Sequence, residues 1–510
     1  MGRVGVRLGR GHRAGAVLGA ALTVSLCLSL GLASAATAAV QPGEIFVADP
    51  EAEAGKGAIL RVDRATGAQT VVSSGGQFQN PVGVAIGGAG ELFVADADAL
   101  GGTGAVFRVD PDTRQQQVVA SGGAFREPTG VAAARGALVV ADPDATFPNQ
   151  SDGDGAVISV DIDTGRQSPG TAPLGGQLVD PSGVVLPGGG GLVFTDANAG
   201  EGGSGVVYAL TLVTRGSFVT LPIASGGNLV DPFGIAGVPS GFAREGVVVA
   251  DPNAAGGTGA VIGLSPQRVW SSGGDFSDPT GVAFRAGPPS EVLAVDQSAG
   301  GSGAVFSVDP DSAAQASGGQ NPVSSGGRFA QPTGIAVAPP LCKGQFANGV
   351  GSEGDDLIGA NGIVAALGGD DVVRGDDSDD LVCGEEGNDL IESEVGVALT
   401  YGDDEYLGGD GDDKLEGGFA DAGDGRDKLA GGDGDDKARG NGSRDRVTGG
   451  DGNDRLSGGN GKDRVGGGKG KDLLRGGKGK DVLRGGKGRD RCVGGQGNDR
   501  AAGCERKRKI

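Results

Sequence analysis

In Gly449-Gly450-Asp451-Gly452-Asn453-Asp454-Arg455-Leu456-Ser457 the chain shows the clearest copy of a nine-residue repeat. Glycine holds places one, two and four, aspartate holds place six, and an apolar residue holds place eight. The aspartates of place six, all but the first spaced by nine residues, are Asp413, Asp427, Asp436, Asp445, Asp454, Asp463, Asp472, Asp481, Asp490 and Asp499. A strict period with one apolar place predicts stacked strands, whereas a disordered glycine-rich linker would need neither feature.

Each place of the repeat has a physical reason. Glycine lets the chain adopt positive φ angles and exposes main-chain carbonyl groups at a tight turn. Aspartate supplies the hard, anionic oxygen that Ca²⁺ prefers over nitrogen or sulfur. The apolar side chains of place eight are expected to point into the array, and they are Leu415, Leu429, Val447, Leu456, Val465, Leu474 and Leu483.

The frame closely resembles the RTX, or hemolysin-type calcium-binding, repeat over about residues 351–503. The resemblance implies a parallel β-roll that binds several Ca²⁺ ions through the ten aspartates of place six. A turn of such a roll binds metal only together with a neighbouring turn. We therefore expect the roll to fold with its ions.

Charge and regularity change along the array. Residues 351–460 carry 30 acidic and 9 basic side chains, whereas residues 461–510 carry 6 acidic and 16 basic ones. Place three holds Lys469, Lys478 and Lys487 in the late copies, and their positive charge should weaken calcium binding there. The copies before residue 392 are degenerate. Residues 392–407 break the frame, which predicts a loop or a distorted turn.

A longer repeat fills residues 40–340. A Pro-x-Gly phrase followed by Val or Ile recurs at steps of 47 to 53 residues, beginning at Pro81, Pro128, Pro181, Pro232, Pro279 and Pro332. This period, with four strand signals in each copy, predicts propeller blades. The chain enters at the second strand of a blade, residues 43–49, and the missing first strand is found at residues 332–337. Six blades in a closed ring follow, and they resemble an NHL-type or gluconolactonase-like propeller.

One aspartate ends the second strand of every blade: Asp49, Asp96, Asp142, Asp196, Asp251 and Asp296. In one interpretation each caps a turn by accepting backbone N–H groups. In the other, the six line a face that binds calcium or another ligand. The large rings Trp270, Tyr208 and Phe233 could line a pocket, but we expect them to pack in the core.

Residues 1–39 have the features of a secretory signal peptide. Arg3, Arg7, Arg10 and Arg13 precede an apolar run at residues 14–32, and Ala33-Ser34-Ala35 offers a cleavage site. An uncleaved anchor is the alternative. No other apolar run approaches the ~20 residues that span a bilayer, so no transmembrane segment is predicted in the mature chain. The product is expected to be secreted and extracellular, with a net charge of 39 − 65 = −26.

Cleavage would also remove Cys27 and His12, the only histidine. A chain without histidine has no Ser-His-Asp triad and no histidine-bound zinc or iron. The remaining cysteines are Cys342, Cys383, Cys492 and Cys504. An even number in an exported chain suggests disulfides, and pairing within each end of the repeat array is the simplest of the three connectivities.

The predicted fold is therefore all-β, a six-bladed β-propeller followed by a calcium-binding parallel β-roll. The expected boundaries are a signal peptide at 1–39, the propeller at 40–340, a linker at 341–350, the roll at 351–503 and a basic tail at 504–510.

We expect an exported calcium-binding protein that is not an enzyme and whose propeller face binds an unidentified extracellular ligand. The net negative charge disfavours nucleic acid as a partner. The basic tail is expected to make weak contact with an anionic cell surface. The alternative is a calcium-dependent, lactonase-like hydrolase or lyase in the propeller. Its mark would be an asymmetric cluster of buried carboxylates holding one metal at the propeller centre.

Overall fold

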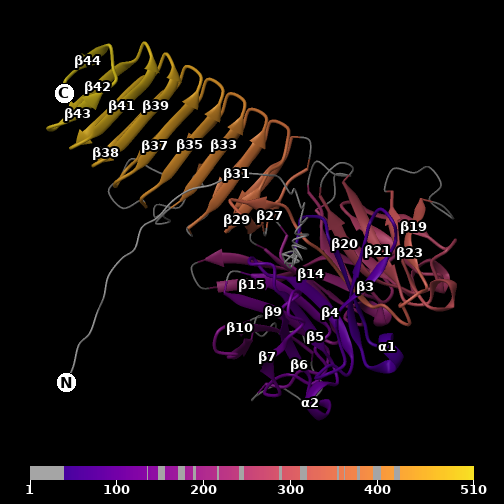
Figure 1. The fold of residues 1–510 in the computed structure, drawn as a ribbon. Coiled ribbons are helices and arrows are strands. Elements are labelled where there is room, and N and C mark those ends of the chain that lie inside the picture. Colours follow the sequence, from indigo (N-terminus) through magenta and orange to yellow (C-terminus); the bar gives the residue numbers. More distant parts are fainter. Residues whose placement is uncertain are drawn as a thin grey trace, which may run out of the picture. The chain divides into compact units, whose positions relative to one another are not determined.

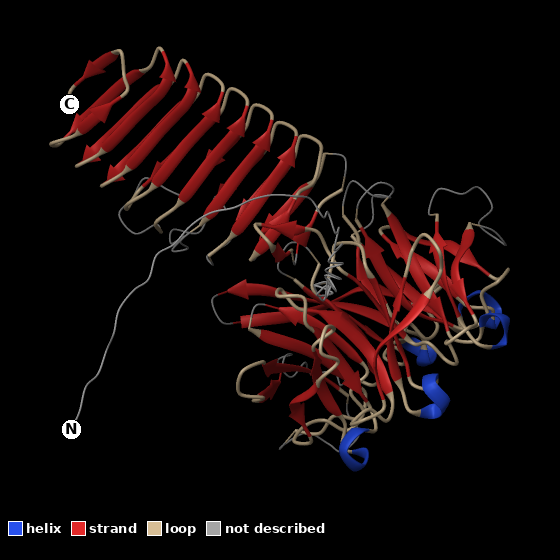
Figure 2. Ribbon diagram, in the orientation of Figure 1, coloured by secondary structure: helices blue, strands red, loops and turns tan. Residues whose placement is uncertain are grey.

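The structure, a computed structural model, describes residues 40–134, 136–147, 155–169, 178–187, 191–214, 217–239, 246–286, 290–309, 319–347, 349–352, 355–360, 362–375, 379–393, 404–417 and 425–510. These residues are nearly all-β, as predicted, and form a six-bladed propeller and a parallel roll (Figure 1, Figure 2). The predicted signal peptide, with Cys27 and His12, lies outside them. In this part of the chain no helix has the length and apolar character needed to cross a membrane.

Six antiparallel sheets of four strands form the blades. From the inner strand outward they are β24 (Gly334–Val337), β1 (Ile45–Asp49), β2 (Ala58–Val62), β3 (Gln69–Ser74); β4 (Pro81–Ile86), β5 (Leu92–Asp96), β6 (Ala105–Val109), β7 (Gln116–Ser121); β8 (Gly130–Ala134), β9 (Ala137–Asp142), β10 (Ala156–Asp161), β11 (Gln167–Pro169); β12 (Pro181–Val185), β13 (Leu192–Asp196), β14 (Val206–Thr214), β15 (Ser217–Ser225); β16 (Ile235–Gly237), β17 (Val247–Asp251), β18 (Ala260–Leu264), β19 (Gln267–Ser272); and β20 (Pro279–Arg285), β21 (Glu291–Asp296), β22 (Ala304–Val308), β23 (Gln320–Ser325). Short helical turns join second and third strands in five blades: α1 (Ala52–Gly55), α2 (Ala99–Gly102), η1 (Glu201–Gly203), α3 (Ala254–Gly257) and η2 (Ala299–Gly301).

The ring closes through strands from the two ends of the propeller sequence. β24 pairs antiparallel with β1, so that Val337 lies opposite Ile45 and Ile335 lies opposite Val47. Ile335 is buried in the same hydrophobic cluster as Ile45 and Val47. The displaced strand predicted from the sequence therefore completes the first blade, which removes its open edge. The prediction of six blades is confirmed.

The glycine of the Pro-x-Gly phrase lies where inner strands of neighbouring blades approach each other. A Cβ atom on Gly83 would lie 2.2 Å from the carbonyl oxygen of Thr129 in the next blade, and the other five phrase glycines face comparable contacts. The hydroxyl of Thr129 donates a 3.0 Å hydrogen bond to the carbonyl of Ser182 in the blade after it. Any larger residue would push the inner strands apart, so the phrase recurs because the axis is crowded.

Glutamines at the start of the outer strands form hydrogen bonds that join neighbouring blades. These contacts are not predicted from the sequence. Gln116 Nε2 donates to Ser73 Oγ at 3.0 Å and to the carbonyl of Gly75 at 2.9 Å, and its Oε1 accepts from the N–H of Gln77 at 2.8 Å. Similar bonds to the adjacent blade are made by Gln69, Gln167, Gln267 and Gln320. These amides satisfy loop groups that would otherwise lack partners at the blade junctions.

Two parallel sheets of nine strands form the roll. The first sheet contains β27 (Gly349–Val350), β29 (Ile363–Ala365), β31 (Leu381–Glu386), β33 (Glu405–Asp410), β35 (Lys428–Asp433), β37 (Arg446–Asp451), β39 (Arg464–Gly470), β41 (Val482–Gly488) and β43 (Arg500–Ala502). The second contains β28 (Leu357–Ala360), β30 (Val372–Gly375), β32 (Leu390–Ser393), β34 (Lys414–Glu416), β36 (Lys437–Asn441), β38 (Arg455–Gly461), β40 (Leu473–Gly479), β42 (Arg491–Gln496) and β44 (Arg506–Arg508). Successive strands of the chain alternate between the sheets, so two nonapeptides make one coil.

The core of the roll is the apolar eighth place of the repeat. All seven predicted side chains are buried in one cluster, which also contains Tyr406 and Cys492. From β35 to β43, paired residues within a sheet lie 18 positions apart, as Val447 and Val465 do, whereas Arg491 of β42 and Arg506 of β44 lie 15 apart. Insertions lengthen two earlier coils, so that Glu405 pairs with Lys428, 23 positions later. The strands of these coils still pair in parallel with the next strand of the same sheet. The predicted loop at 392–407 falls largely on residues 394–403, which are outside the described residues.

Disulfides lie at both ends of the roll. Cys342 bonds to Cys383, and Cys492 bonds to Cys504, which is the simplest of the three connectivities considered. Cys342 belongs to a two-stranded hairpin, β25 (Leu341–Cys342) and β26 (Gln345–Phe346). The ring of Phe346 packs in a hydrophobic cluster of the propeller. The segment between the repeats is therefore structured and is anchored by both a covalent bond and a buried ring.

Candidate calcium sites of the roll

The glycines of the repeat bring oxygen atoms close together at each turn. In the turn that ends at Asp454, Gly450 and Gly452 have φ angles of 145° and 144°, which side chains rarely allow. A Cβ atom on Gly450 would lie 2.0 Å from the carbonyl oxygen of Gly432, one coil earlier. A Cβ atom on Gly449 would lie 1.9 Å from Oδ2 of Asp454 itself. Glycine is thus required so that main-chain carbonyls and the carboxylate can pack against each other.

The aspartates of place six form two rows. The first row lies in turns that lead from the first sheet to the second, and it contains Asp371, Asp389, Asp413, Asp436, Asp454, Asp472 and Asp490. The second row lies in the turns that lead back, and it contains Asp427, Asp445, Asp463, Asp481 and Asp499. The N–H of each aspartate as far as Asp481 donates to Oδ1 of the aspartate one coil later, for example from Asp454 to Asp472 at 3.1 Å and from Asp463 to Asp481 at 3.0 Å. The N–H of Asp490 donates instead to Oε2 of Glu505 at 2.6 Å.

Only one oxygen of each carboxylate is satisfied by these bonds. All twelve aspartates are buried, and Oδ2 of every one lacks a hydrogen-bond partner. The ten predicted aspartates are all among them. Asp371 and Asp389 share the arrangement, although their copies depart from the frame. The apolar residues two positions later, Val373 and Ile391, are both buried, and this signal could have identified both aspartates.

Burial raises the pKa of these carboxyl groups in the absence of metal. Desolvation is the largest cause, and it raises the pKa of Asp436, Asp454 and Asp472 to about 6 and that of Asp413 to about 7. The hydrogen bond from the preceding aspartate lowers the pKa, and neighbouring carboxylates raise it further. A cation beside Oδ2 would remove this penalty, because it favours the ionised form.

The oxygen atoms of the turns suit calcium. Ca²⁺ takes 6–8 oxygen ligands and accepts both carboxylates and main-chain carbonyls. No group of three His, Cys, Asp or Glu side chains converges as a metal site anywhere in the described ranges. A metal at Oδ2 of Asp454 would therefore be held by one carboxylate per turn together with carbonyl oxygens of the glycine-rich turns. The donor set fits a hard cation and is unsuited to zinc, which prefers nitrogen and sulfur.

The two rows differ in the charge of places three and five. In the first row these places are acidic or neutral as far as Asn453, including Asp410, Asp412, Asp433, Asp435 and Asp451, and then turn basic. In the second row, place five is basic at Arg426, Arg444, Lys462 and Lys480, whereas place three changes from Asp424 to Lys478. In the last copy both places are neutral, Gln496 and Asn498. The gradient expected along the sequence is therefore present at place three in both rows, and at place five it is confined to the first row. Where the first row becomes basic, Lys469 forms an ion pair with Asp451 of the preceding coil.

The six aspartates of the propeller are bonded differently. Asp251 accepts backbone N–H groups at both oxygens, from Val230 and Asp231 at Oδ2 and from Asn253 and Ala254 at Oδ1, over 2.6–3.0 Å. The other five, Asp49, Asp96, Asp142, Asp196 and Asp296, also accept backbone N–H bonds at both oxygens. All six are fully buried. This geometry favours the capping interpretation of the ring.

The three large rings singled out in the propeller have different surroundings. Trp270 is fully buried in a hydrophobic cluster between two blades, as expected. Tyr208 stacks on Phe194 with ring centroids 5.4 Å apart. Phe233 is partly buried near the axis, where its carbonyl oxygen accepts a 2.9 Å hydrogen bond from Thr195.

Known proteins resemble the two repeat regions separately. Residues 358–391, 400–421, 421–456, 439–474 and 466–501 match the family model of the RTX calcium-binding nonapeptide repeat. Among curated proteins, none matches the chain. Similar solved structures include TolB from Acinetobacter baumannii, with 14% identity, 58% of this chain and 67% of that chain covered, and a TM-score of 0.40. They also include a gluconolactonase from Xanthomonas campestris, with 16% identity, 58% and 89% covered, and a TM-score of 0.37.

The match to the repeat family and the geometry of the turns agree. The C-terminal region is a calcium-binding β-roll, and Ca²⁺ is its cofactor.

Proposed function

We propose that this protein is exported and that calcium outside the cell folds its roll, while the propeller binds an extracellular ligand. The twelve buried Oδ2 atoms without hydrogen-bond partners carry the proposal. A buried, unpaired carboxylate oxygen costs free energy that only a proton or a cation can offset. At the calcium concentrations of extracellular sites, ~10⁻⁴–10⁻³ M, the cation is available outside the cell and scarce in the cytoplasm.

Two further features support export. The repeat family is typical of exported proteins, and the predicted signal peptide provides a route. The two disulfides also suit an oxidising compartment. Calcium at the aspartates of both rows would then act as a structural ion, because each carboxylate is held by an N–H of the preceding coil.

For the propeller we propose a binding role and no catalysis. Its repeated aspartates have both oxygens occupied by backbone N–H groups, which leaves these carboxylates poorly suited to proton transfer. The runner-up is a histidine-free, calcium-dependent lactonase-like hydrolase or lyase. It would need an asymmetric carboxylate cluster at the axis, and a separate metal there would distinguish it from a binding module.

The test uses residues 40–510 after removal of metal with a chelator. Calcium should bind with a stoichiometry of several ions per chain, measured by calorimetry and by metal analysis of the dialysed protein. A screen of small lactones and of surface glycans on the same sample then separates the two propeller functions. Turnover of a lactone that survives Asp454→Asn but is lost on calcium removal would place a catalytic metal in the propeller. Failure to bind calcium at all would overturn the proposal for the roll.

A further inference from the structure

The second row of the roll carries a groove of about 760 Å³ on its glycine-rich turns. We call it the basic groove and define it by six of its lining side chains: Arg444, Lys462, Lys478, Lys480, Gln496 and Asn498. The four cationic side chains are exposed. The groove thus lies on the outer surface of the calcium-binding turns, with the aspartates buried beneath it.

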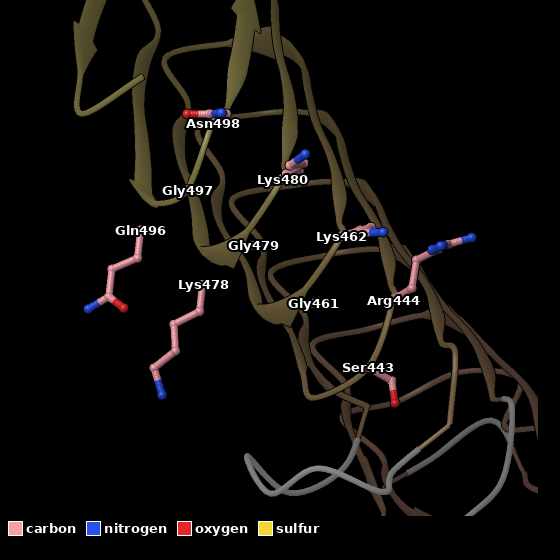
Figure 3. Close-up of a pocket in the computed structure, with 10 residues that line it drawn as sticks. All are labelled: Ser443, Arg444, Gly461, Lys462, Lys478, Gly479, Lys480, Gln496, Gly497 and Asn498. Carbon is pink, nitrogen blue, oxygen red and sulfur yellow. The ribbon is translucent and has the colours of Figure 1, made fainter.

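The charges of the groove are arranged in lines. Arg444, Lys462, Lys480 and Asn498 are 18 residues apart and follow one another on successive coils (Figure 3). Adjacent strands of a sheet are separated by ~4.8 Å, so the three cations repeat at about that spacing. Lys478 and Gln496 form a second line on the other side of the glycines that floor the groove (Figure 3).

The ion pairs of the described residues do not neutralise this charge. Among the ion pairs within the described residues, none involves the four cationic side chains of the basic groove. On the opposite row, by contrast, Lys469 is paired with Asp451. Like charges held this close repel each other, which favours a partner that brings negative charge at a similar spacing.

Calcium should strengthen the positive electrostatic field of the basic groove. Without metal, the buried carboxylates of Asp463 and Asp481 lie close to Gly461 and Gly479 on the floor of the groove, and in their ionised form they oppose its positive charge. Each bound Ca²⁺ would add two positive charges at that depth and leave the surface cations uncompensated. Binding at the groove would therefore depend on the metal that folds the turns.

We propose that the basic groove binds a linear acidic polysaccharide when the roll is loaded with calcium. The inference rests on the proposed calcium loading of the second row. Cations in line suit a chain with regularly repeated carboxylate or sulfate groups, and the amides of Gln496 and Asn498 can hydrogen-bond its hydroxyl groups. The residues that line the groove include no aromatic ring, so the stacking platform that single-stranded nucleic acids use is lacking there.

The experiment measures binding by residues 40–510 to immobilised hyaluronate, which carries carboxylates, and dextran sulfate, which carries sulfates. Uncharged dextran and a single-stranded oligonucleotide are the comparison surfaces. With ~1 mM calcium, a concentration in the range of extracellular sites, at least one acidic polysaccharide should bind and dextran should not. Binding should weaken with added salt. The triple variant Arg444→Gln, Lys462→Gln, Lys480→Gln should lose roughly tenfold in affinity or more, as expected for several lost charge contacts.

The matched control removes three cations from the first row: Lys469→Gln, Lys471→Gln and Lys487→Gln. It should change affinity less than the groove variant, although it lowers the net charge by the same amount. The sequence predicts a basic tail at 504–510, but Arg506–Arg508 form β44, the last strand of the second sheet. A second control, Arg506→Gln with Arg508→Gln, tests whether the cations of β44 are responsible. Calcium titration of every variant shows whether the metal sites survive.

Three outcomes would overturn the inference while leaving calcium binding intact. The first is a loaded roll that binds neither acidic polysaccharide. The second is equal loss of affinity in the groove variant and the first-row control. The third is preference for the oligonucleotide over both acidic polysaccharides, which would assign the groove to nucleic acid. Absence of calcium binding would instead count against the proposed function itself.

Discussion

The propeller and the roll both bury an aspartate in every repeat, but they leave its two oxygens in different states. In the propeller, backbone N–H groups reach both oxygens, as they do at Asp251. In the roll, one N–H reaches Oδ1, and Oδ2 has no partner, as at Asp454. A repeated buried carboxylate therefore caps a turn in the propeller, whereas in the roll it has an oxygen available to bind a metal. The residue type alone does not distinguish them; the hydrogen bonds do.

The largest expected difference between the regions is their response to calcium removal. A chelator should abolish most of the β structure of residues 349–510, because twelve carboxylate oxygens that accept no hydrogen bond would then be buried without a metal. The propeller should keep its structure. Circular dichroism and hydrogen exchange of the whole mature chain would show this. Identical spectra with calcium and with chelator would contradict it, and the same test applies to the isolated repeats at 408–503.

The propeller should depend on chain closure instead of metal. Ending the chain after Gly327 removes β24, including the buried Ile335, whose burial is worth roughly 1.5–3 kcal/mol, and leaves β1 with an open edge. Against a total stability of ~5–15 kcal/mol this loss should prevent stable folding. A chain ending after Pro340 should retain a propeller although it lacks the roll. Thermal unfolding of 40–327 and 40–340 decides the matter, and similar melting would disprove closure by β24.

Matched substitutions test the comparison at single residues. Asp251→Asn should destabilise the propeller by about 1–3 kcal/mol, because the amide group confronts backbone donors, and calcium should not restore the loss. Asp454→Asn should weaken calcium binding and leave the melting temperature of the propeller unchanged. Differential scanning calorimetry at two calcium concentrations separates the effects. If calcium rescued Asp251→Asn, the capping interpretation would be wrong.

Smaller differences are expected along and between the rows. Asp436→Ala and Asp454→Ala lie in acidic or neutral turns and should each reduce calcium affinity more than Asp472→Ala and Asp481→Ala, whose turns contain lysine. Calorimetric titration of the four variants measures this. Because Asp481 is in the second row, Asp472 provides the comparison within one row. Equal losses at all four positions would show that the lysines do not weaken their sites.

Acid should substitute in part for calcium. The pKa of Asp436, Asp454 and Asp472 is raised to about 6 in the calcium-free fold, and that of Asp371 to about 8, mainly by desolvation. A raised pKa means that the folded state holds protons more tightly than the unfolded state. The resulting stability is therefore greatest below pH 3.8 and is lost as the pH rises through about 6 to 8. In calcium-free buffer the roll should show more β structure at pH 5 than at pH 7.5, by circular dichroism. The opposite order would refute this.

Much of the architecture could be predicted because, in both repeats, single residues at fixed positions indicate how the strands pack. The buried eighth place gave the core of the roll, and the phrase at Pro332 gave the ring closure. What escaped prediction depends on partners distant in sequence. Gln116 contacts Ser73 and Gly75 of the preceding blade, and nothing in its local sequence signals this. Likewise, a period of nine does not reveal that alternate turns lie in separate rows, because the alternation appears only once the two sheets are formed.

The alternation of strands between two sheets also limits how this array can grow in evolution. Duplication of one nonapeptide would shift every later turn to the opposite row. If the duplication fell between Arg444 and Lys462, then Lys462 and Lys480 would join the row of acidic turns, and the line of cations would be divided. Duplication of eighteen residues preserves the parity of every turn, and so keeps each row intact. A lineage that retains the groove should therefore lengthen or shorten its roll by whole coils.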